Sequence, residues 1–267
     1  MSDLSKMKLP LLTLCLILPA ASAARAQDGD GLRLSLGAAG VYRPEFKGSK
    51  DYEFKPLPFV ALRYGRGDYY VALEGPSLRV NLVPGGFVEA GPMITYDRGR
   101  DDDIKNLTVR RLGEIDAAVN AGVFIRKRFD VGQDALSVGI EALTDTGKVH
   151  EGKLARFEVA YDRQLTDRWS LGVDASATWA DRKYMRTYYG VSAAGAAASG
   201  LTPYTAKAGV ESVDVGASLR YKISDRWSAL ARGGYSRLVD SAADSPIVAR
   251  EGSANQGQLV FALMYSF

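Results

Sequence analysis

The sequence predicts an all-β protein, a transmembrane antiparallel up-and-down β-barrel of twelve strands, with ten to twelve strands compatible with the pattern. Three observations lead to this fold class. Segments about as long as a membrane-spanning strand alternate apolar and polar residues with a period of two. Their apolar faces end in aromatic side chains, and the chain ends on an alternating strand whose last residue is Phe267. An apolar outer band, aromatic girdles and a polar interior are typical of a transmembrane barrel.

The first 26 residues have the features of a secretory signal peptide. Lys6 and Lys8 form a charged start, residues 9–20 form an apolar run, and Ala24-Arg25-Ala26 supplies a small-x-small cleavage site. The apolar run is too short to span a bilayer as a helix. We therefore expect residues 1–26 to be removed and residues 27–267 to form the barrel.

Charge and cysteine content exclude several function classes. The chain has 34 basic and 31 acidic residues, and removal of residues 1–26 leaves 31 and 30. This balance gives no reason to expect nucleic acid as a partner. Cys15, the only cysteine, lies in the expected signal peptide after Leu14, where a lipoprotein site would need a small residue. We therefore expect neither lipidation nor disulfides.

Alternation is clearest in residues 213–223, and residues 155–164 and 169–179 repeat it. Successive side chains of a strand point to opposite faces, so one face of each segment is apolar and the other polar. Soluble antiparallel sheets also alternate. Two details favour a membrane barrel: the polar faces carry charges and glycines, and aromatic residues stand at the ends of the apolar faces, namely Trp169, Trp179, Trp227, Tyr221, Tyr235 and Tyr265.

Eleven segments carry strand patterns, near residues 32–42, 54–64, 69–82, 86–97, 114–129, 135–146, 153–165, 168–181, 209–223, 227–239 and 257–267. Bacterial single-chain barrels have even strand numbers. The segment 69–82 changes parity at Gly75-Pro76, which indicates either a bulged strand or two short strands. Two short strands would give the expected twelve.

Tight turns and long polar stretches separate these segments. Thr166–Trp169 and Ser224–Trp227 are near copies, and Pro84-Gly85-Gly86 is a third tight turn. We expect the short turns and both termini on the periplasmic side, and residues 43–53, 98–113, 181–208 and 240–256 in extracellular loops. The Gly/Ala/Ser-rich residues 190–200 are expected to form a mobile loop and not a helix.

The last strand indicates the compartment. Leu259, Phe261, Leu263, Tyr265 and Phe267 share one face of it. Barrel closure requires this strand to pair with the first one, so its apolar face must contact lipid. Tyr265 and the terminal Phe267 also resemble the signal that the barrel-assembly machinery reads. We therefore expect a multi-pass β-barrel of the cell outer membrane, with membrane lipids and the assembly machinery as partners.

Three stretches carry a family resemblance: Pro44–Tyr52 with Pro56-Leu57-Pro58 and Arg63-Tyr64-Gly65, then Lys183–Val191, then Ala243–Val248. On these residues the chain resembles the MipA/OmpV family (MltA-interacting protein) over essentially its whole mature length. Lys183 stands where arginine is expected. The residues that the resemblance singles out are Tyr184, Met185, Tyr189, Gly190, Asp244, Ser245 and Pro246.

The resemblance implies a non-enzymatic outer-membrane barrel that acts as a scaffold for peptidoglycan remodelling. Such a scaffold brings a murein hydrolase, the lytic transglycosylase, together with a murein synthase, a penicillin-binding protein. Other family members are treated as pores, adhesins or antigens, so a small-solute channel or an adhesin is the alternative. No catalytic residues are defined for the family, and none is carried over to this chain.

Candidate residues for catalysis or metal binding are few. His150, the only histidine, is flanked by Lys148 and Glu151 and is expected to be a solvated loop residue. Asp101-Asp102-Asp103 could contact calcium, but three adjacent carboxylates cannot converge on one ion without other ligands. We therefore expect no catalytic residue, no cofactor and no metal site.

Charged residues also fall on the predicted inward faces: Arg33, Arg79, Arg126, Arg156, Arg220 and Arg232, with Glu74, Glu89, Asp116, Glu141, Glu158 and Asp174. They either pair into a network that fills a narrow lumen or line a pore for small polar solutes. The similar numbers of each sign favour pairing.

Overall fold

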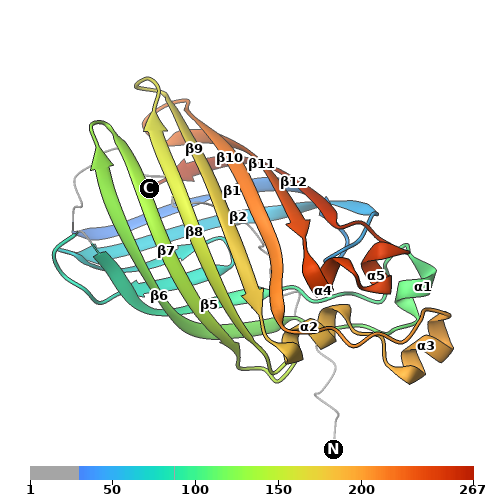
Figure 1. Ribbon diagram of the computed structural model, residues 1–267. Coiled ribbons are helices and arrows are strands. Elements are labelled where there is room, and N and C mark those ends of the chain that lie inside the picture. Colours follow the sequence, from blue (N-terminus) through green and yellow to red (C-terminus); the bar gives the residue numbers. More distant parts are fainter. Residues whose placement is uncertain (1–29, 87) are drawn as a thin grey trace, which may run out of the picture.

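The structure, a computed structural model, describes residues 30–86 and 88–267 (Figure 1). The expected signal peptide, residues 1–26, lies outside the described residues. Within them, twelve antiparallel strands form one closed barrel in which each strand pairs with its neighbours in sequence and β12 pairs with β1. The predicted twelve-stranded up-and-down barrel is therefore confirmed.

The strands are β1 (Gly31–Pro44), β2 (Tyr52–Arg66), β3 (Tyr69–Glu74), β4 (Ser77–Asn81), β5 (Val88–Asp97), β6 (Ala118–Val131), β7 (Asp134–Asp145), β8 (Lys153–Gln164), β9 (Trp169–Ala180), β10 (Gly209–Lys222), β11 (Trp227–Leu238) and β12 (Asn255–Ser266). The helices are α1 (Leu107–Arg110), α2 (Arg182–Tyr189), α3 (Ala193–Ser199), α4 (Asp240–Ala243) and α5 (Pro246–Ala249). None of these five helices has the length and apolar run that a helical membrane crossing needs.

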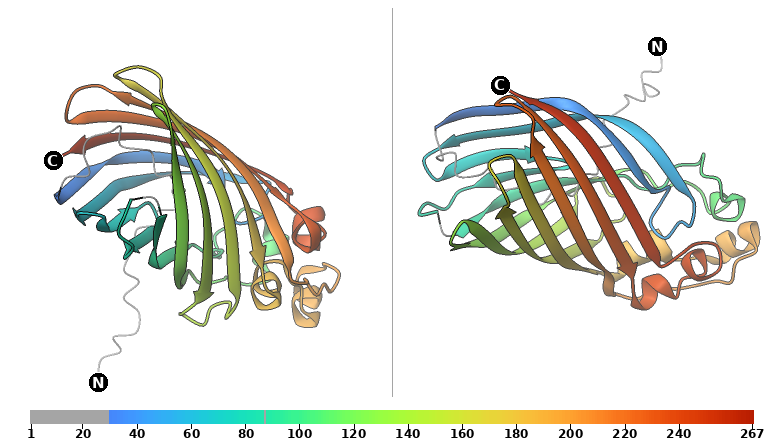
Figure 2. Two further views of the ribbon diagram at one scale, coloured as in Figure 1. Left: turned by 60° about the vertical axis from the view of Figure 1, so that its left-hand side comes forward. Right: turned by 90° about the horizontal axis from the view of Figure 1, so that it is seen from above.

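The two ends of the barrel differ (Figures 1 and 2). At one end, here called the turn end, β1 begins, β12 ends, and the strands are joined by short turns. At the other, here called the loop end, all five helices gather. Because outer-membrane barrels keep their short turns in the periplasm, we expect the turn end to be the periplasmic end.

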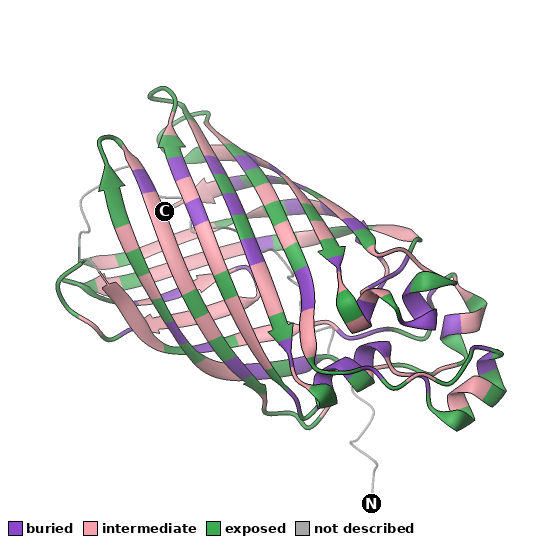
Figure 3. Ribbon diagram, in the orientation of Figure 1, coloured by how far each residue is buried: buried purple, intermediate pink, exposed green. Residues whose placement is uncertain are grey.

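Alternation along the strands matches the prediction (Figure 3). On β12, Phe261 is 61% exposed, whereas its neighbours Val260 and Ala262 are buried at 1% and 6%. The outer surface is therefore apolar, as a lipid-facing wall requires. One part of the inner wall is also apolar, which the sequence pattern did not predict: a core cluster there contains Ala39, Val41, Phe59, Leu230, Val260, Ala262 and Met264.

The segment 69–82 forms two short strands, β3 and β4, joined at Gly75-Pro76. Gly75 has φ +58°, a left-handed conformation that glycine adopts without strain. Because the hairpin is short, β2 pairs with β3 only from Ala61 to Arg66, although it pairs with β1 from Tyr52 to Gly65. Residues 52–60 of β2 therefore form a strand edge.

The edge of β2 explains the prolines of the first family-like stretch. Pro56 and Pro58 lie in this edge, opposite Gly40 and Ala38 of β1. Proline has no backbone N–H and is tolerated in an edge strand, where it also removes donors that another strand could pair with. The two prolines therefore fit within β2 without interrupting it.

Aromatic residues form the predicted girdle at the turn end. The Trp169 and Tyr221 rings lie 4.5 Å apart, and the Trp227 and Tyr265 rings lie 5.2 Å apart. The ring of Phe267 packs at 4.9 Å from that of Tyr265, and its backbone N–H donates to the carbonyl of Leu34 on β1. The C-terminal residue therefore belongs to the seam that closes the barrel.

Some sequence-based predictions were wrong. Residues 190–200 were expected to form a loop without helix, but they contain α3, capped by Ser192 and by Gly200 in the left-handed conformation. Alanine is the best helix former, and its propensity prevails here over the low complexity of the run. β6 begins at Ala118 and not at residue 114, so Asp116 lies exposed in the preceding loop and not on an inward face.

Candidate functional site: the plug at the loop end

The three family-like stretches, which lie far apart in the sequence, meet at the loop end of the barrel. α2 carries the second stretch, α5 carries the third, and the loop between β1 and β2 carries part of the first. We call the assembly of Lys47, Asp97, Glu211 and α2, together with the apolar cluster beneath α2, the plug. Its conformation depends on how α2 is formed.

Residues within and next to α2 determine where this helix begins, which face it buries and where it ends. The carboxylate of Asp181 accepts a hydrogen bond from the backbone N–H of Tyr184, which caps the helix N-terminus. The buried residues Tyr184, Met185, Tyr188 and Tyr189 are spaced so that they share one helix face. Gly190 ends the helix, and a Cβ at this position would lie only 2.4 Å from the carbonyl oxygen of Arg186.

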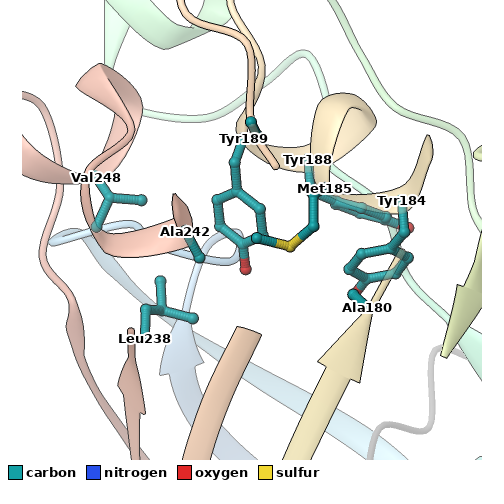
Figure 4. Close-up of a cluster of buried hydrophobic side chains, with 9 residues drawn as sticks. Ala180, Tyr184, Met185, Tyr188, Tyr189, Leu238, Ala242 and Val248 are labelled. Atoms are coloured by element: carbon teal, nitrogen blue, oxygen red, sulfur yellow. The ribbon is translucent and has the colours of Figure 1, made fainter. Parts of the chain in front are cut away.

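The buried face of α2 packs on an apolar cluster (Figure 4). The cluster also includes Leu238 at the end of β11, Ala242 of α4 and Val248 of α5, all nearly inaccessible to solvent. Its members come from the ends of strands and from separate helices, so burial of this face fixes α2 on the barrel.

A polar network lies at the centre of the plug. The Nζ atom of Lys47 is 2.7 Å from Oδ2 of Asp97 and 3.9 Å from Oε1 of Glu211, and it donates a hydrogen bond to the Tyr184 hydroxyl. Glu211 accepts hydrogen bonds from the hydroxyls of Tyr184, at 3.2 Å, and Tyr189, at 2.7 Å.

The network joins distant parts of the barrel rim. Lys47 lies in the β1–β2 loop, Asp97 at the end of β5, Glu211 on β10, and the tyrosines on α2. In the closed ring, β1, β5 and β10 are well separated. One group of hydrogen bonds and ion pairs therefore crosses the loop-end opening.

Burial and charge shift the ionisation of the plug. Burial disfavours the charged ammonium, but the carboxylates of Asp97 and Glu211 outweigh it and raise the pKa of Lys47 well above its usual value. Burial, and then the nearby Glu211 carboxylate, raise the pKa of both Tyr184 and Tyr189 well above 10. At neutral pH the plug therefore contains a charged lysine and neutral tyrosines.

Ser245, in the third family-like stretch, also holds α2 in place. The hydroxyl of Ser245 donates to the Tyr189 carbonyl at 2.7 Å and accepts from the Ile247 N–H. Ser245 and Pro246 are buried, whereas Asp244 is exposed and ends α4. Of the residues singled out by the resemblance, Asp244 alone stays outside the buried contacts. Tyr265 and Phe267 lie at the turn end, far from this site.

His150 also belongs to the plug, contrary to the prediction that it is a solvated loop residue. It is 3% exposed, and its ring packs edge-on against Tyr184 at 4.9 Å. The Gly152 N–H donates to Nδ1, so Nε2 must carry the proton and donate to Oδ1 of Asn120 at 2.9 Å. Burial lowers the pKa of His150 and favours this neutral form. Both ring nitrogens are thus occupied by structural hydrogen bonds.

Beneath the plug, several of the inward charges form ion pairs along the inner wall, between strands that are two or three places apart in the ring. Nη2 of Arg79 on β4 lies 2.6 Å from Oε1 of Glu141 on β7. Arg232 on β11 makes two hydrogen bonds, of 2.7 and 3.0 Å, to the carboxylate of Asp174 on β9. Gly216, on the strand between them, leaves room for this pair, because a Cβ there would lie 2.4 Å from Nη2 of Arg232.

Space remains between these pairs. A cavity of about 360 Å³ is lined by the charged residues and by Lys47 and Tyr184 of the plug. The lumen thus contains ion pairs and a cavity lined by both charged and apolar side chains, with the plug at its loop end. Among the described residues, no group of three or more His, Cys, Asp or Glu side chains is placed to hold a metal ion.

Sequence reasoning did not identify Lys47, Asp97 or Glu211 as parts of one site. The register of β10 against β9 shifts between Val210 and Ser212, so Glu211 lies at an irregularity that redirects its side chain into the plug. The sequence carries a trace of this shift, since Val210 and Val213 differ in parity. Nothing local indicates that Lys47 would reach Glu211.

Comparisons with solved structures found weak similarities to other barrels. OmpT of Vibrio cholerae is 10% identical, with a TM-score of 0.44 over 88% of this chain and 97% of its own. An outer membrane channel from Pseudomonas putida F1 is 11% identical, with a TM-score of 0.45 over 90% and 96%. The translocator domain of the autotransporter NalP from Neisseria meningitidis is 12% identical, with a TM-score of 0.45 over 93% and 92%. These scores are too low to carry an argument.

The comparison with curated proteins found no match. The family model described as "MltA-interacting protein MipA", in contrast, matches residues 36–267. This range includes most of β1, all of β2 to β12 and the whole plug. The chain therefore belongs to the MipA family and is a β-barrel protein of the outer membrane.

Proposed function

We propose that this protein is a non-enzymatic scaffold that holds murein-remodelling enzymes together at the outer membrane, a lytic transglycosylase with a penicillin-binding protein. The family description, which names an interaction with MltA, supports this proposal. The structural observation that carries it is the occupied lumen. The plug crosses the loop-end opening, and ion pairs such as Arg79–Glu141 and Arg232–Asp174 lie on the inner wall below it. A scaffold functions with such a lumen, whereas a channel needs continuous water.

The turn end offers a regular surface for such partners. In the β8–β9 turn, the backbone N–H of Trp169 donates to the Thr166 hydroxyl, and in the β10–β11 turn Trp227 makes the same bond to Ser224. Each turn also accepts a backbone hydrogen bond from a neighbouring strand. The Arg168 carbonyl accepts from the N–H of Lys222 on β10, and the Arg226 carbonyl accepts from the N–H of Ser266 on β12. The two turns therefore present the same backbone shape twice.

Affinity capture from envelope extracts, together with planar-bilayer recording, tests the scaffold role. The test variant changes only the exposed tips of the two turns, Asp167→Asn with Arg168→Gln and Asp225→Asn with Arg226→Gln. The Thr166 and Ser224 caps stay in place, so the turns should still fold. The matched control neutralises the exposed Asp101, Asp102 and Asp103 at the loop end.

For a scaffold, we expect the unchanged protein and the loop-end control to capture the transglycosylase and the penicillin-binding protein, and the turn variant to lose them. We also expect no unitary conductance. Steady conductance without capture of either enzyme would overturn the scaffold role.

A small-solute channel is the second candidate, because the lumen retains a cavity of about 360 Å³ lined by charged side chains. If the plug is a gate, its removal should open a conducting path. Lys47→Met combined with Tyr184→Ala should then produce steady single-channel currents where the unchanged protein gives brief ones. Silent bilayers with both proteins would exclude this candidate.

A further inference from the structure

A trough runs along the lipid-facing side of β11. Between Trp227 and Tyr235, the outward positions of this strand are Ala229, Ala231 and Gly233. The facing positions on β12 carry large, exposed apolar side chains: Leu259 at 47%, Phe261 at 61% and Leu263 at 46%. On β10, Tyr221 and Leu219 face Ala229 and Ala231, whereas the small Ala217 faces Gly233. The row of small residues is thus bordered by large side chains on both sides near the turn end, and it is open on the β10 side at Gly233.

Towards the loop end the trough widens into a groove of about 640 Å³. Tyr42, Val215, Tyr235 and Leu259 are among the outward side chains that line it. Its floor includes two glycines, Gly233 on β11 and Gly257 on β12. They are diagonal neighbours, since Gly233 pairs with Leu259 and Tyr235 pairs with Gly257.

Neither glycine is needed for backbone conformation or packing. Neither has a positive φ. A Cβ at Gly233 would come no closer than 3.7 Å to Leu259, and a Cβ at Gly257 would lie 3.4 Å from the Tyr52 hydroxyl. Glycine within a strand weakens it and often marks a place where another molecule approaches closely. What these two residues supply is therefore open space in a lipid-facing wall.

A cation lies at the loop-end limit of the groove. Arg237, the next outward residue of β11 after Tyr235, is exposed. Its Nη1 donates to Oδ1 of Asn255 at 2.6 Å, and the Tyr235 hydroxyl donates to the same oxygen at 2.7 Å. In the part of the chain that the structure describes, no carboxylate lies within ion-pair distance of Arg237. Asn255 thus holds the guanidinium in place, and the other N–H groups of Arg237 remain available as donors.

We propose that this trough binds one acyl chain of a phosphate-bearing lipid of the outer leaflet, with the lipid phosphate on Arg237. The trough faces hydrocarbon and begins at Gly233, two outward positions from Arg237 on the same strand. An acyl chain whose phosphate lies on Arg237 can therefore run along the groove and enter the trough at Gly233. A guanidinium with free donors suits a phosphate because it can form two parallel hydrogen bonds.

The lipid site is independent of the scaffold role, since it lies on the outer wall near the loop end. Native mass spectrometry of the purified barrel tests it, with purified lipid A and its dephosphorylated form as probes. Gly233→Leu fills the trough, and Ala142→Leu on the lipid-facing side of β7 adds the same side chain elsewhere. Arg237→Gln removes the headgroup contact, and Arg163→Gln removes an exposed charge at the turn end of β8.

We expect one lipid A to remain on the unchanged protein, and at least a tenfold lower bound fraction for Gly233→Leu. Ala142→Leu should bind as the unchanged protein does. Arg237→Gln should remove the preference for the phosphorylated probe, and Arg163→Gln should keep it. All variants must still show the heat-modifiable mobility of a folded barrel.

Equal lipid retention by Gly233→Leu and Ala142→Leu would overturn the proposal. So would conversion of an oligomer to a monomer by Gly233→Leu, because the trough would then be an interface between copies of this chain.

Discussion

The Nζ atom of Lys47 lies 2.7 Å from Oδ2 of Asp97, 50 positions further along the chain. This ion pair, with Glu211 on its other side, connects the β1–β2 loop to the rim of the barrel and to α2. Because removal of Lys47 leaves two carboxylates without their cation, this side chain contributes to the conformation of the loop end together with the apolar cluster beneath α2.

Lys47→Met should therefore destabilise the folded barrel. Loss of one partner of a fully buried pair costs about 3–5 kcal/mol. The Lys47 side chain is 32% exposed, so we expect a smaller loss, about 2 kcal/mol. Urea unfolding in lipid vesicles measures it. The exposed Lys50 in the same loop gives the control, and an equal loss for Lys50→Met would contradict the special role of Lys47.

Alkaline pH should weaken the plug. The pKa values of Lys47, Tyr184 and Tyr189 are raised in the folded protein, so folded groups keep their protons when unfolded ones lose them. Their stabilisation is fully present below about pH 10, the usual pKa of these groups, and is lost as the pH rises towards the raised values. Unfolding free energy measured from pH 8 to pH 12 should fall only above about pH 10.

Two adjacent tyrosines of α2 should respond differently to loss of their hydroxyls. The Tyr189 hydroxyl donates to the Glu211 carboxylate at 2.7 Å, and Tyr189→Phe should cost about 1.5–3 kcal/mol, as for a hydrogen bond to a charged group. The Tyr188 hydroxyl is buried without a hydrogen-bond partner among the described residues, so Tyr188→Phe should be nearly neutral. Paired urea titrations compare them, and equal losses would count against the network.

Two neighbouring inward glycines should also differ. A methyl group at Gly216 would lie 2.4 Å from the guanidinium of Arg232, so Gly216→Ala should displace the Arg232–Asp174 pair and cost about 1–3 kcal/mol. A methyl group at Gly234 meets nothing within 4 Å, and Gly234→Ala should change stability by less than about 0.5 kcal/mol. The same unfolding assay decides between them.

Deletion of Phe267, or its replacement by a charged residue, should slow membrane insertion and leave the chain in the periplasm. The residue is 72% exposed on the lipid side, packs on Tyr265 and bonds through its backbone to Leu34 of β1. The last strand must be recognised and must then bury its apolar face in lipid. Cell fractionation and heat-modifiable mobility measure the effect. Normal amounts of folded barrel in the outer membrane after the deletion would refute this role.

The sequence by itself determined the barrel. Period-two alternation indicates which face of each strand contacts lipid. This face can be identified from the residues of one strand, without knowledge of the other strands. The parity change at Gly75-Pro76 indicated either a bulged strand or two short strands, and the structure has two, β3 and β4. The apolar face of β12 identified the strand that closes the ring.

Only the tertiary structure decided the plug and the trough. His150 was predicted to be solvated because its neighbours in sequence are polar, but its ring contacts Asn120, Tyr184 and Tyr188, which the closed barrel brings to it. Likewise, Lys47 meets Glu211 across the ring, and Gly233 meets Gly257 across a strand pair. Local patterns report which side of a strand is apolar, whereas contacts between separate elements depend on strand register and ring closure, which become defined when the whole barrel forms.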